Sequence, residues 1–226
     1  MKQGSKKKSR KKGSKFLYLF IGFFLFVGYV LFFHRETITE RAIQYRLDAV
    51  DKLYGDEVTR IAVKYGHAPE YYLALIMLES SGRSVIPPRF EPHIYEQLVL
   101  LQDNERKDYE HVTHRNVKNL SSNGLRNLAS SWGPFQIMGY KCLELKITVA
   151  DLRGSEAIRY GMYWINKNYG NRLTRKQYTN AFHYHNTGRL FPKNGMSLTH
   201  DRDYIPNGLK YMEYFRQKRL KEAAAN

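Results

Sequence analysis

The sequence predicts a mainly α-helical globular domain that is preceded by a single N-terminal transmembrane helix. An uncharged apolar run occupies residues 16–33, and in later segments apolar residues recur with a period near 3.6. Alternating strand patterns are scarce, apart from a stretch that could hold a small β element. With 226 residues, the chain is long enough to bury one hydrophobic core.

The N-terminal charges indicate how the apolar run is oriented. Residues 1–33 contain eight lysines and arginines and no acid, so the net charge of +16 falls to +8 (29 basic minus 21 acidic) in residues 34–226. The basic block precedes the apolar run, and no small-residue cleavage site follows it. We therefore expect residues 1–15 to be a basic cytoplasmic tail and residues 16–33 a signal anchor in the cytoplasmic (inner) membrane. A buried core helix is the alternative.

The remaining chain would then lie in the periplasm or another extracytoplasmic space. We expect a membrane-proximal helix over residues 34–55 and a globular domain over residues 56–226. Helical periodicity spans 36–66, with Gly55 as an expected interruption and Gly66 as a left-handed cap. Residues 103–131 are unassigned, and 131–140 suit a tight packed loop or a short helix start. Further helices are expected at 69–82, 92–102, 155–169, 174–186 and from 207 onward.

Glu79 is the first candidate for chemistry because it follows an apolar run, YYLALIML, at the end of the expected 69–82 helix. An apolar setting disfavours the charged form of a carboxyl group, so such a group suits donating a proton to a glycosidic oxygen. The alternative is structural: Glu79 could cap the helix end or pair with Arg83 at i+4.

Four segments, in this order, resemble the soluble lytic transglycosylase family of the lysozyme-like superfamily. They are residues 70–84 around LIMLESSG, GPFQIM (133–138), AFHYHNTG (181–188) and RDYIPNGLKYMEYF (202–215). The resemblance spans roughly residues 56–216 and implies a lysozyme-like fold. It also implies that Glu79 is the catalytic acid/base. Pro134, Phe135 and Gly139 depart from the family's usual residues.

RFEPHIY (89–95) and SWGPFQIMG (131–139) are similar to a neighbouring branch, the N-acetylmuramidase-like domains. Glu91 lies in the first of these motifs. It could be a second carboxylate that supports the transition state or orients a water molecule. It could equally be a buried ion-pair partner of Arg89 or His93. These two interpretations stay open.

The resemblance implies a set of substrate-binding residues around Glu79: Ser80, Ser81, Glu91, Gln136, Ile137, Met138, Tyr184, His185, Asn186 and Tyr204. Each could instead be structural: Ser80 and Ser81 as a polar helix end, and Ile137 as part of the core. In the AFHYHNTG cluster the spacing departs by one residue from the family pattern. Either Tyr184 or His185 then takes the place of the family tyrosine that approaches the glutamate, and we favour Tyr184.

The expected function is cleavage of the MurNAc–GlcNAc β-1,4 bond of peptidoglycan glycan strands, with formation of 1,6-anhydroMurNAc ends. One carboxylate suffices because the attacking C6 hydroxyl belongs to the same sugar. The alternatives are a hydrolytic N-acetylmuramidase and a non-catalytic glycan-binding scaffold, with unknown envelope-complex proteins as possible partners. Nucleic acid is not expected, because half of the positive charge lies in the tail.

No cofactor or metal is expected. Cys142 is the only cysteine, so an intramolecular disulfide is excluded. The histidines at 111, 114, 183 and 185 lack the His-Glu-x-x-His spacing of a zinc protease helix.

Overall fold

The computed structural model describes residues 20–24, 26, 28–29 and 35–225. The chain divides into two units, Met1–Tyr45 and Arg46–Asn226. Helix α2 (Arg35–Tyr65) runs from the first unit into the second. Within the described residues, no helix is both long and apolar enough to cross a membrane. Much of the predicted signal anchor, including residues 16–19 and 30–33, lies outside the described residues, as does the predicted tail.

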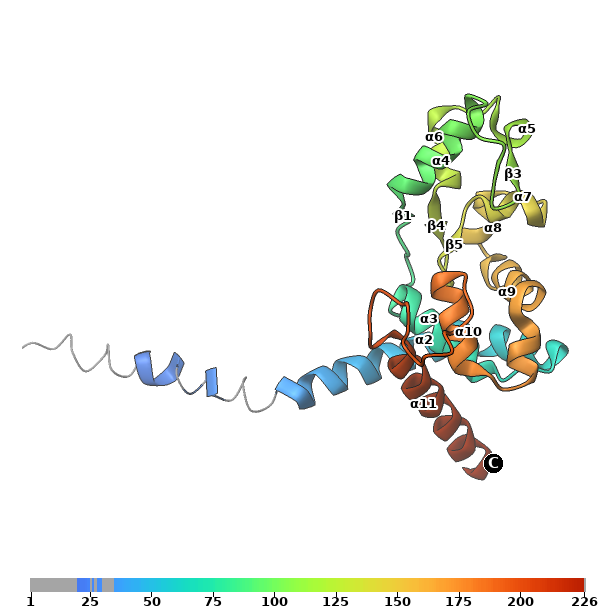
Figure 1. Cartoon of the computed structure of the whole chain (residues 1–226). Helices are drawn as coiled ribbons and strands as arrows, with labels where there is room; N and C mark the ends of the chain where they lie inside the picture. Colours follow the sequence, from blue (N-terminus) through green and yellow to red (C-terminus); the bar gives the residue numbers. More distant parts are fainter. Residues whose placement is uncertain (1–19, 25, 27, 30–34, 226) are drawn as a thin grey trace, which may run out of the picture. The chain divides into compact units, whose positions relative to one another are not determined.

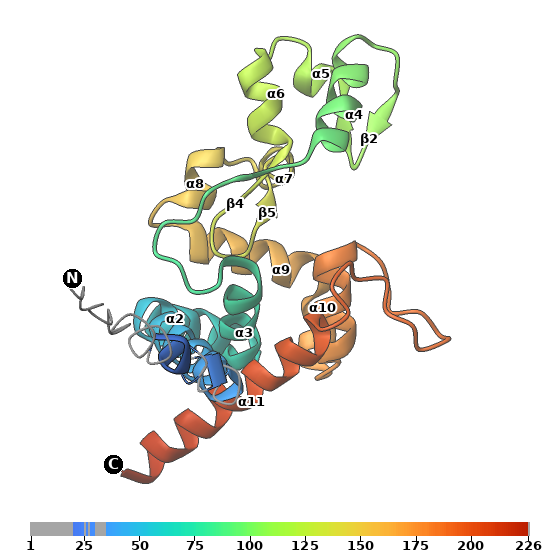
Figure 2. The same ribbon diagram turned by 90° about the vertical axis from the view of Figure 1, so that its left-hand side faces the viewer.

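The second unit is mainly helical, as the sequence predicts, and its strands are two or three residues long (Figures 1 and 2). After α2, the helices are α3 (Pro69–Ser80), α4 (Pro92–Gln102), α5 (His114–Val117), α6 (Ser122–Leu128), α7 (Lys141–Leu145), α8 (Val149–Arg153), α9 (Ala157–Thr174), α10 (Tyr178–Thr187) and α11 (Tyr204–Ala225). The strands are β1 (Arg89–Phe90), β2 (Asp108–Tyr109), β3 (Val112–Thr113), β4 (Ser130–Trp132) and β5 (Ile137–Met138).

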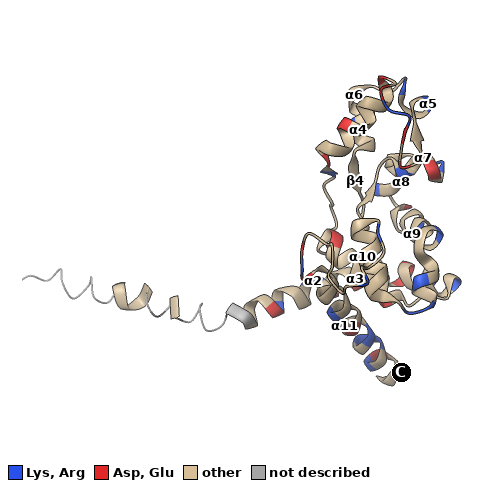
Figure 3. Cartoon of the chain, viewed as in Figure 1, with Lys and Arg blue, Asp and Glu red and all other residues tan. Residues whose placement is uncertain are grey.

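Helix α3 forms the centre of the main core. Its residues Tyr71 to Met77 are all buried, and α11 packs along it. Each large apolar side chain that is fully buried contributes roughly 1.5–3 kcal/mol. Helix α11 is also tied to α2, because the Lys218 ammonium lies 2.7 Å from the Asp51 carboxylate and 3.2 Å from that of Asp48. Both helices carry basic and acidic residues (Figure 3).

A smaller core lies in a lobe made of residues 92–129, which we call the small lobe; it appears at the top of Figure 1. The buried residues of this core are Ile94, Leu98, Leu101, Val112, Val117, Leu125, Leu128, Ala129 and Tyr140. The antiparallel sheet β1-β4-β5 lies where this lobe meets the rest of the unit, and the β2-β3 pair lies within the lobe.

Several sequence-based predictions need correction. Helix α2 continues through Gly55. A glycine inside a helix lowers its stability by about 1 kcal/mol relative to alanine, and the packing of the rest of the helix offsets this loss. Of the two alternatives for 131–140, the structure has the tight packed loop, as the turn of a β-hairpin, and not the helix start. Helix α11 begins at Tyr204 rather than at 207. Helices α7 and α8 were not predicted, because five residues are too few to show a helical period.

The β4–β5 hairpin depends on one glycine. Gly133 has a φ of +72°, and a Cβ atom at this position would lie 1.9 Å from the carbonyl oxygen of Leu152. A side chain here would therefore clash with backbone atoms, and the residue would also have to adopt an unfavourable positive φ. Gly195 has a similar φ of +78° but open space around it.

We expect Gly133→Ala to lower the free energy of unfolding by more than about 3 kcal/mol, since it combines overpacking with backbone strain. Gly195→Ala carries only the left-handed backbone penalty, about 1–2 kcal/mol. Urea denaturation of the full-length chain compares the two variants. Similar losses for both would show that the approach to Leu152 does not constrain the hairpin.

Candidate active site

Glu79 lies in the last turn of α3, one residue before that helix ends. The two residues that follow Ser80 have left-handed backbone angles, with φ of 53° at Ser81 and 70° at Gly82. A Cβ atom on Gly82 would come within 2.9 Å of the Arg46 carbonyl oxygen on α2, so the turn needs glycine to pack this closely. The turn ends α3 directly after Glu79 and leaves its side chain 15% exposed.

The Tyr204 hydroxyl, at the first residue of α11, donates a short hydrogen bond to Oε1 of Glu79. Burial raises the pKa of Tyr204 well above its ordinary value, and the negative charge of Glu79 raises it further. A hydrogen bond with the Asn186 side chain opposes the increase. Tyr204 therefore stays protonated at neutral pH and acts as a donor to the carboxylate.

His185 is the second group that faces Glu79, with 3.9 Å between its Nε2 and Oε1 of the carboxylate. Its Nε2 lies 3.0 Å from the Phe135 carbonyl oxygen, which can only accept, so Nε2 carries the proton. Its Nδ1 then accepts from the Tyr169 hydroxyl at 2.7 Å, and Tyr169 in turn accepts from Tyr71 at 3.3 Å.

This tautomer is neutral, and its surroundings keep it so. Burial lowers the pKa of His185 below its ordinary value of 6.5, against the opposing effects of the Glu79 charge and the Phe135 carbonyl. At neutral pH, the 3.9 Å approach of His185 to Glu79 is therefore not an ion pair. The two groups that face Oε1 of Glu79, the Tyr204 hydroxyl and the His185 ring, are therefore both neutral.

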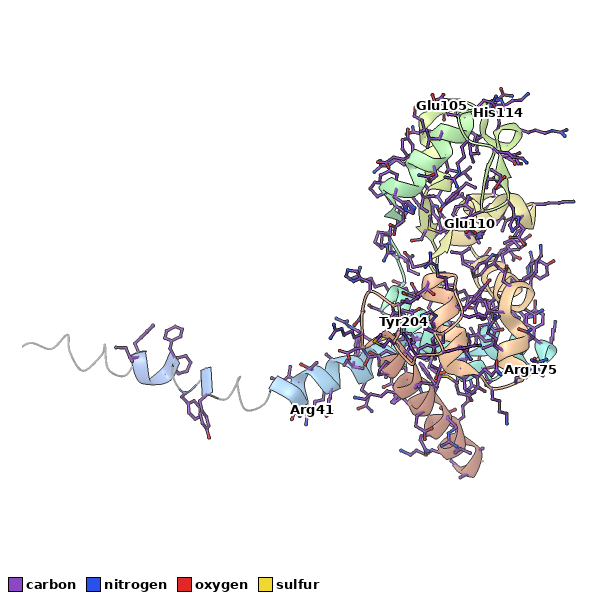
Figure 4. All side chains as sticks on the ribbon, in the orientation of Figure 1. Arg41, Glu105, Glu110, His114, Arg175 and Tyr204 are labelled. Carbon is purple, nitrogen blue, oxygen red and sulfur yellow. The ribbon has the colours of Figure 1, made fainter. Side chains whose placement is uncertain are left out.

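Two surface hollows meet at Gln136. The first, of about 350 Å³, is called the Glu79 hollow; its lining residues are Glu79, Ser80, Ser81, Arg83, Ile86, Pro87, Pro88, Arg89 and Gln136. The second, of about 390 Å³, is called the aromatic hollow. Its lining residues are His93, Ile94, Tyr109, Glu110, Gln136, Ile137, Met138, Tyr140, Lys141, Trp164, Asn168, Tyr184, His185, Asn186, Thr187 and Gly188. In Figure 4, the labelled Glu110 lies on the small-lobe side, and Tyr204 lies lower, beside α10.

The hairpin fixes Gln136 between the two hollows. Its backbone is left-handed, with a φ of 46°, and its side-chain amide is held on both sides. The Ser131 hydroxyl donates to Oε1 of Gln136 at 2.8 Å, and Nε2 of Gln136 donates to the Gly133 carbonyl at 3.1 Å. The amide has one further N–H, which a bound ligand could accept.

The other predicted binding residues differ in how far they could reach a ligand. Ser80 is buried, and its hydroxyl donates to the Ile76 carbonyl at 2.7 Å, which is a bond within the helix. Ser81 lines the Glu79 hollow, and Met138 lines the aromatic hollow. Ile137 also lines that hollow but is only 3% exposed, so most of its side chain belongs to the core.

Tyr184 does not take the position facing Glu79 that we favoured for it. His185 occupies that position, while the Tyr184 ring lies 5.4 Å from that of Tyr169 and 4.6 Å from the Arg172 guanidinium. The reason is the phase of α10: the His185 ring is bonded to the Phe135 carbonyl of the hairpin and to the Tyr169 hydroxyl of α9, which holds this residue on the inward side of the helix. Tyr184 still lines the aromatic hollow.

Glu91 forms an ion pair with Arg89, whose Nε lies 2.7 Å from the Glu91 carboxylate. The pair is solvent-exposed, with 31% of the Glu91 side chain accessible, so it is not the buried pair we considered. Arg89 lines the Glu79 hollow, whereas Glu91 is not among the residues that line either hollow.

Sequence reasoning missed the buried residues behind the site. Tyr71 and Tyr169 hold His185, and Trp164 forms part of the aromatic hollow, with its ring 6.0 Å from that of His185. No local pattern marks Tyr169; it sits at a kink inside α9, with φ and ψ of −148° and 19°. Contacts across about a hundred residues of sequence have no short-range signature.

Among the described residues, no group of three histidine, cysteine, aspartate or glutamate side chains is placed to hold a metal ion.

No protein-family model, curated protein or solved structure matches this chain.

We expect the free energy of unfolding to be greatest above about pH 6.5, the ordinary pKa of histidine, and to fall as the pH decreases from there through the lower folded pKa of His185. The unfolded chain takes up that proton first, because burial lowers the pKa in the folded state. His185→Gln should show a smaller loss over the same range, and His67, whose pKa burial also lowers, retains part of the slope. Denaturation at a series of pH values measures both slopes. Equal slopes would contradict this account.

Proposed function

We propose that this chain is a membrane-anchored lytic transglycosylase with a lysozyme-like fold, which cleaves the MurNAc–GlcNAc β-1,4 bond of peptidoglycan glycan strands. The observation that carries this proposal is the setting of Glu79. Its partly sheltered carboxyl group receives a hydrogen bond from Tyr204 and lines a hollow that meets a second, aromatic hollow at Gln136. Aromatic faces in such a groove suit the apolar faces of pyranose rings.

The two oxygens of the carboxyl group have different surroundings. Tyr204 donates to Oε1, and the Nε2 of His185 faces the same oxygen. Since the protein holds Oε1, Oε2 is the oxygen available to a ligand in the Glu79 hollow. We assign Oε2 as the atom that donates a proton to the glycosidic oxygen as the bond to the anomeric carbon breaks.

After that step, Glu79 is an anion that can act as a base. It accepts the proton of the MurNAc C6 hydroxyl as the C6 oxygen bonds to the anomeric carbon, which closes the 1,6-anhydro ring and restores the acid. Tyr204, whose raised pKa keeps it protonated, stabilises the carboxylate between the two steps. The 2-acetamido group of the substrate can assist at the anomeric carbon.

A specific observation favours transglycosylation over hydrolysis. An inverting hydrolase needs a second carboxylate to activate water. Glu91, the second carboxylate considered, pairs with Arg89 and does not line the Glu79 hollow. A single carboxylate matches a reaction whose nucleophile belongs to the substrate, because high effective molarity replaces an activated water.

The membrane anchor is part of the proposal. Five aromatic side chains between residues 20 and 29 are exposed: Phe20, Phe23, Phe24, Phe26 and Tyr29. Water is an unfavourable environment for such a cluster, and a bilayer is a favourable one. With lysines and arginines preceding it, the N-terminus would stay in the cytoplasm, and residues 34–226 would lie outside it, facing the wall.

We expect Glu79→Gln to abolish release of muropeptides from purified sacculi by the full-length chain, because glutamine cannot donate or accept the proton. Glu105→Gln, which changes an exposed glutamate of the small lobe, is the matched control and should retain activity (Figure 4). Mass spectrometry of the wild-type products shows the reaction type: anhydro ends indicate transglycosylation, and reducing ends indicate hydrolysis. Intact sacculi after prolonged digestion by the wild type would instead favour a glycan-binding scaffold.

We expect Tyr204→Phe to lower kcat about 10- to 100-fold, which corresponds to the loss of one hydrogen bond to a charged group, about 1.5–3 kcal/mol. KM should change little, because the hydroxyl contacts Glu79 and not the sugar. Tyr214→Phe on the same helix, whose hydroxyl donates to Asp48, is the matched control for a lost tyrosine hydroxyl. An undiminished kcat for Tyr204→Phe would remove this hydroxyl from the mechanism.

A further inference from the structure

The segment between α10 and α11, residues 189–203, has no helix or strand and projects from the body of the unit (Figure 2). Its apolar residues Leu190, Met196 and Leu198 are more than half exposed, so little burial of its own stabilises it. Tyr204, which donates to Glu79, is the next residue along the chain. The segment therefore leads directly into the residue that donates to Glu79.

One side chain, His183 on α10, joins Arg189, the first residue of the projecting segment, to Leu198 in its second half. Its ring is fully buried, and both of its nitrogens contact the backbone of that segment. Nδ1 lies 2.9 Å from the carbonyl oxygen of Arg189, and Nε2 lies 3.1 Å from the amide nitrogen of Leu198. The Phe191 ring packs edge-on against the imidazole, with 5.2 Å between ring centroids.

These partners allow a single tautomer. A carbonyl oxygen can only accept, and a backbone N–H can only donate, so Nδ1 of His183 carries the proton and Nε2 accepts from Leu198. The Thr187 hydroxyl supports the same end of the segment, because it accepts from the Arg189 amide at 3.1 Å. Only a side chain with a donor and an acceptor on opposite sides can replace the ring.

From Leu198, local hydrogen bonds continue to the start of α11. Thr199 is buried, and its hydroxyl donates to the Asp201 carbonyl at 2.8 Å. The Asp201 carboxylate accepts from the Asp203 amide at 2.9 Å, and the Asp203 carbonyl accepts from the Asn207 amide at 2.8 Å. These bonds make residues 198–207 one tightly bonded stretch of backbone.

We propose that His183 is a positioning residue for the reaction: by closing the segment 189–198, it places the Tyr204 hydroxyl on Glu79. This inference rests on the proposed function, because it assigns His183 a role in the cleavage step through Tyr204. His183 itself touches neither the carboxyl group nor either hollow.

A double-mutant cycle on the full-length chain tests this role. We expect His183→Leu to lower kcat by about as much as Tyr204→Phe, roughly 10- to 100-fold. The double variant should be no slower than Tyr204→Phe alone, because both changes remove the same contact. His183→Gln, which keeps a donor and an acceptor, should recover most of the wild-type rate. Multiplied losses in the double variant, or no rescue by glutamine, would overturn the proposal.

Hydrogen exchange gives a readout that does not depend on activity. In His183→Leu, we expect faster exchange of the amides of Leu198, Asp203 and Asn207 and unchanged exchange in α3. Unchanged exchange at these amides would overturn the proposal, and global loss of protection would mean that the variant unfolds. In that case Thr199→Ala, which removes the hydrogen bond from the Thr199 hydroxyl to the Asp201 carbonyl, replaces His183→Leu in the double-mutant cycle. The double variant with Tyr204→Phe should again be no slower than Tyr204→Phe alone. Absence of cleavage by the wild type would refute the proposed function, while exchange would still decide whether His183 orders the start of α11.

Discussion

The hydrogen bond from the Tyr204 hydroxyl to the Glu79 carboxylate joins the end of α3 to the start of α11, across 125 residues of sequence. Helix α11 packs along α3, so this bond lies at one end of the contact between the two helices. The packing of the helices holds the Tyr204 and Glu79 side chains in position. A carboxyl group held in this way keeps one orientation toward the Glu79 hollow. The contacts of the carboxyl group with Tyr204 and with His185 are both to the same oxygen, Oε1.

The two groups that face Oε1 of Glu79 are neutral because they are buried. Burial lowers the pKa of His185, so its ring stays neutral, and burial raises the pKa of Tyr204, so its hydroxyl stays protonated and donates to Glu79 without adding charge. A lysine or arginine in the same place would favour the carboxylate at all times and make a poor acid. The acid/base role that we propose for Glu79 would be served by neighbours that do not change their own protonation at neutral pH.

Local sequence signals predicted the position of Glu79, but not its contacts. Pro69 and Gly82 mark the ends of α3 by their backbone preferences, so the place of Glu79 in the last turn was confirmed. The choice between Tyr184 and His185 was wrong because it depends on the phase of α10 against the hairpin, which is a tertiary property. The Tyr71–Tyr169–His185 chain was not predictable for the same reason, since its members come from three helices.

The two histidines of α10 show how one helix can organise both sides of the site. His183 and His185 are two positions apart, which places them about 200° apart around the helix axis. Their tautomers are opposite: His183 is protonated at Nδ1 and holds the segment that leads to Tyr204, whereas His185 is protonated at Nε2 and holds the Phe135 carbonyl, next to Gln136. Each ring donates to one backbone carbonyl, that of Arg189 or that of Phe135. Helix α10 therefore contacts both the segment that leads to Tyr204 and the hairpin that carries Gln136. A shift of α10 would therefore affect the contacts of Tyr204 and of Gln136 together. One helix thus links the donor to Glu79 with the residue that both hollows share.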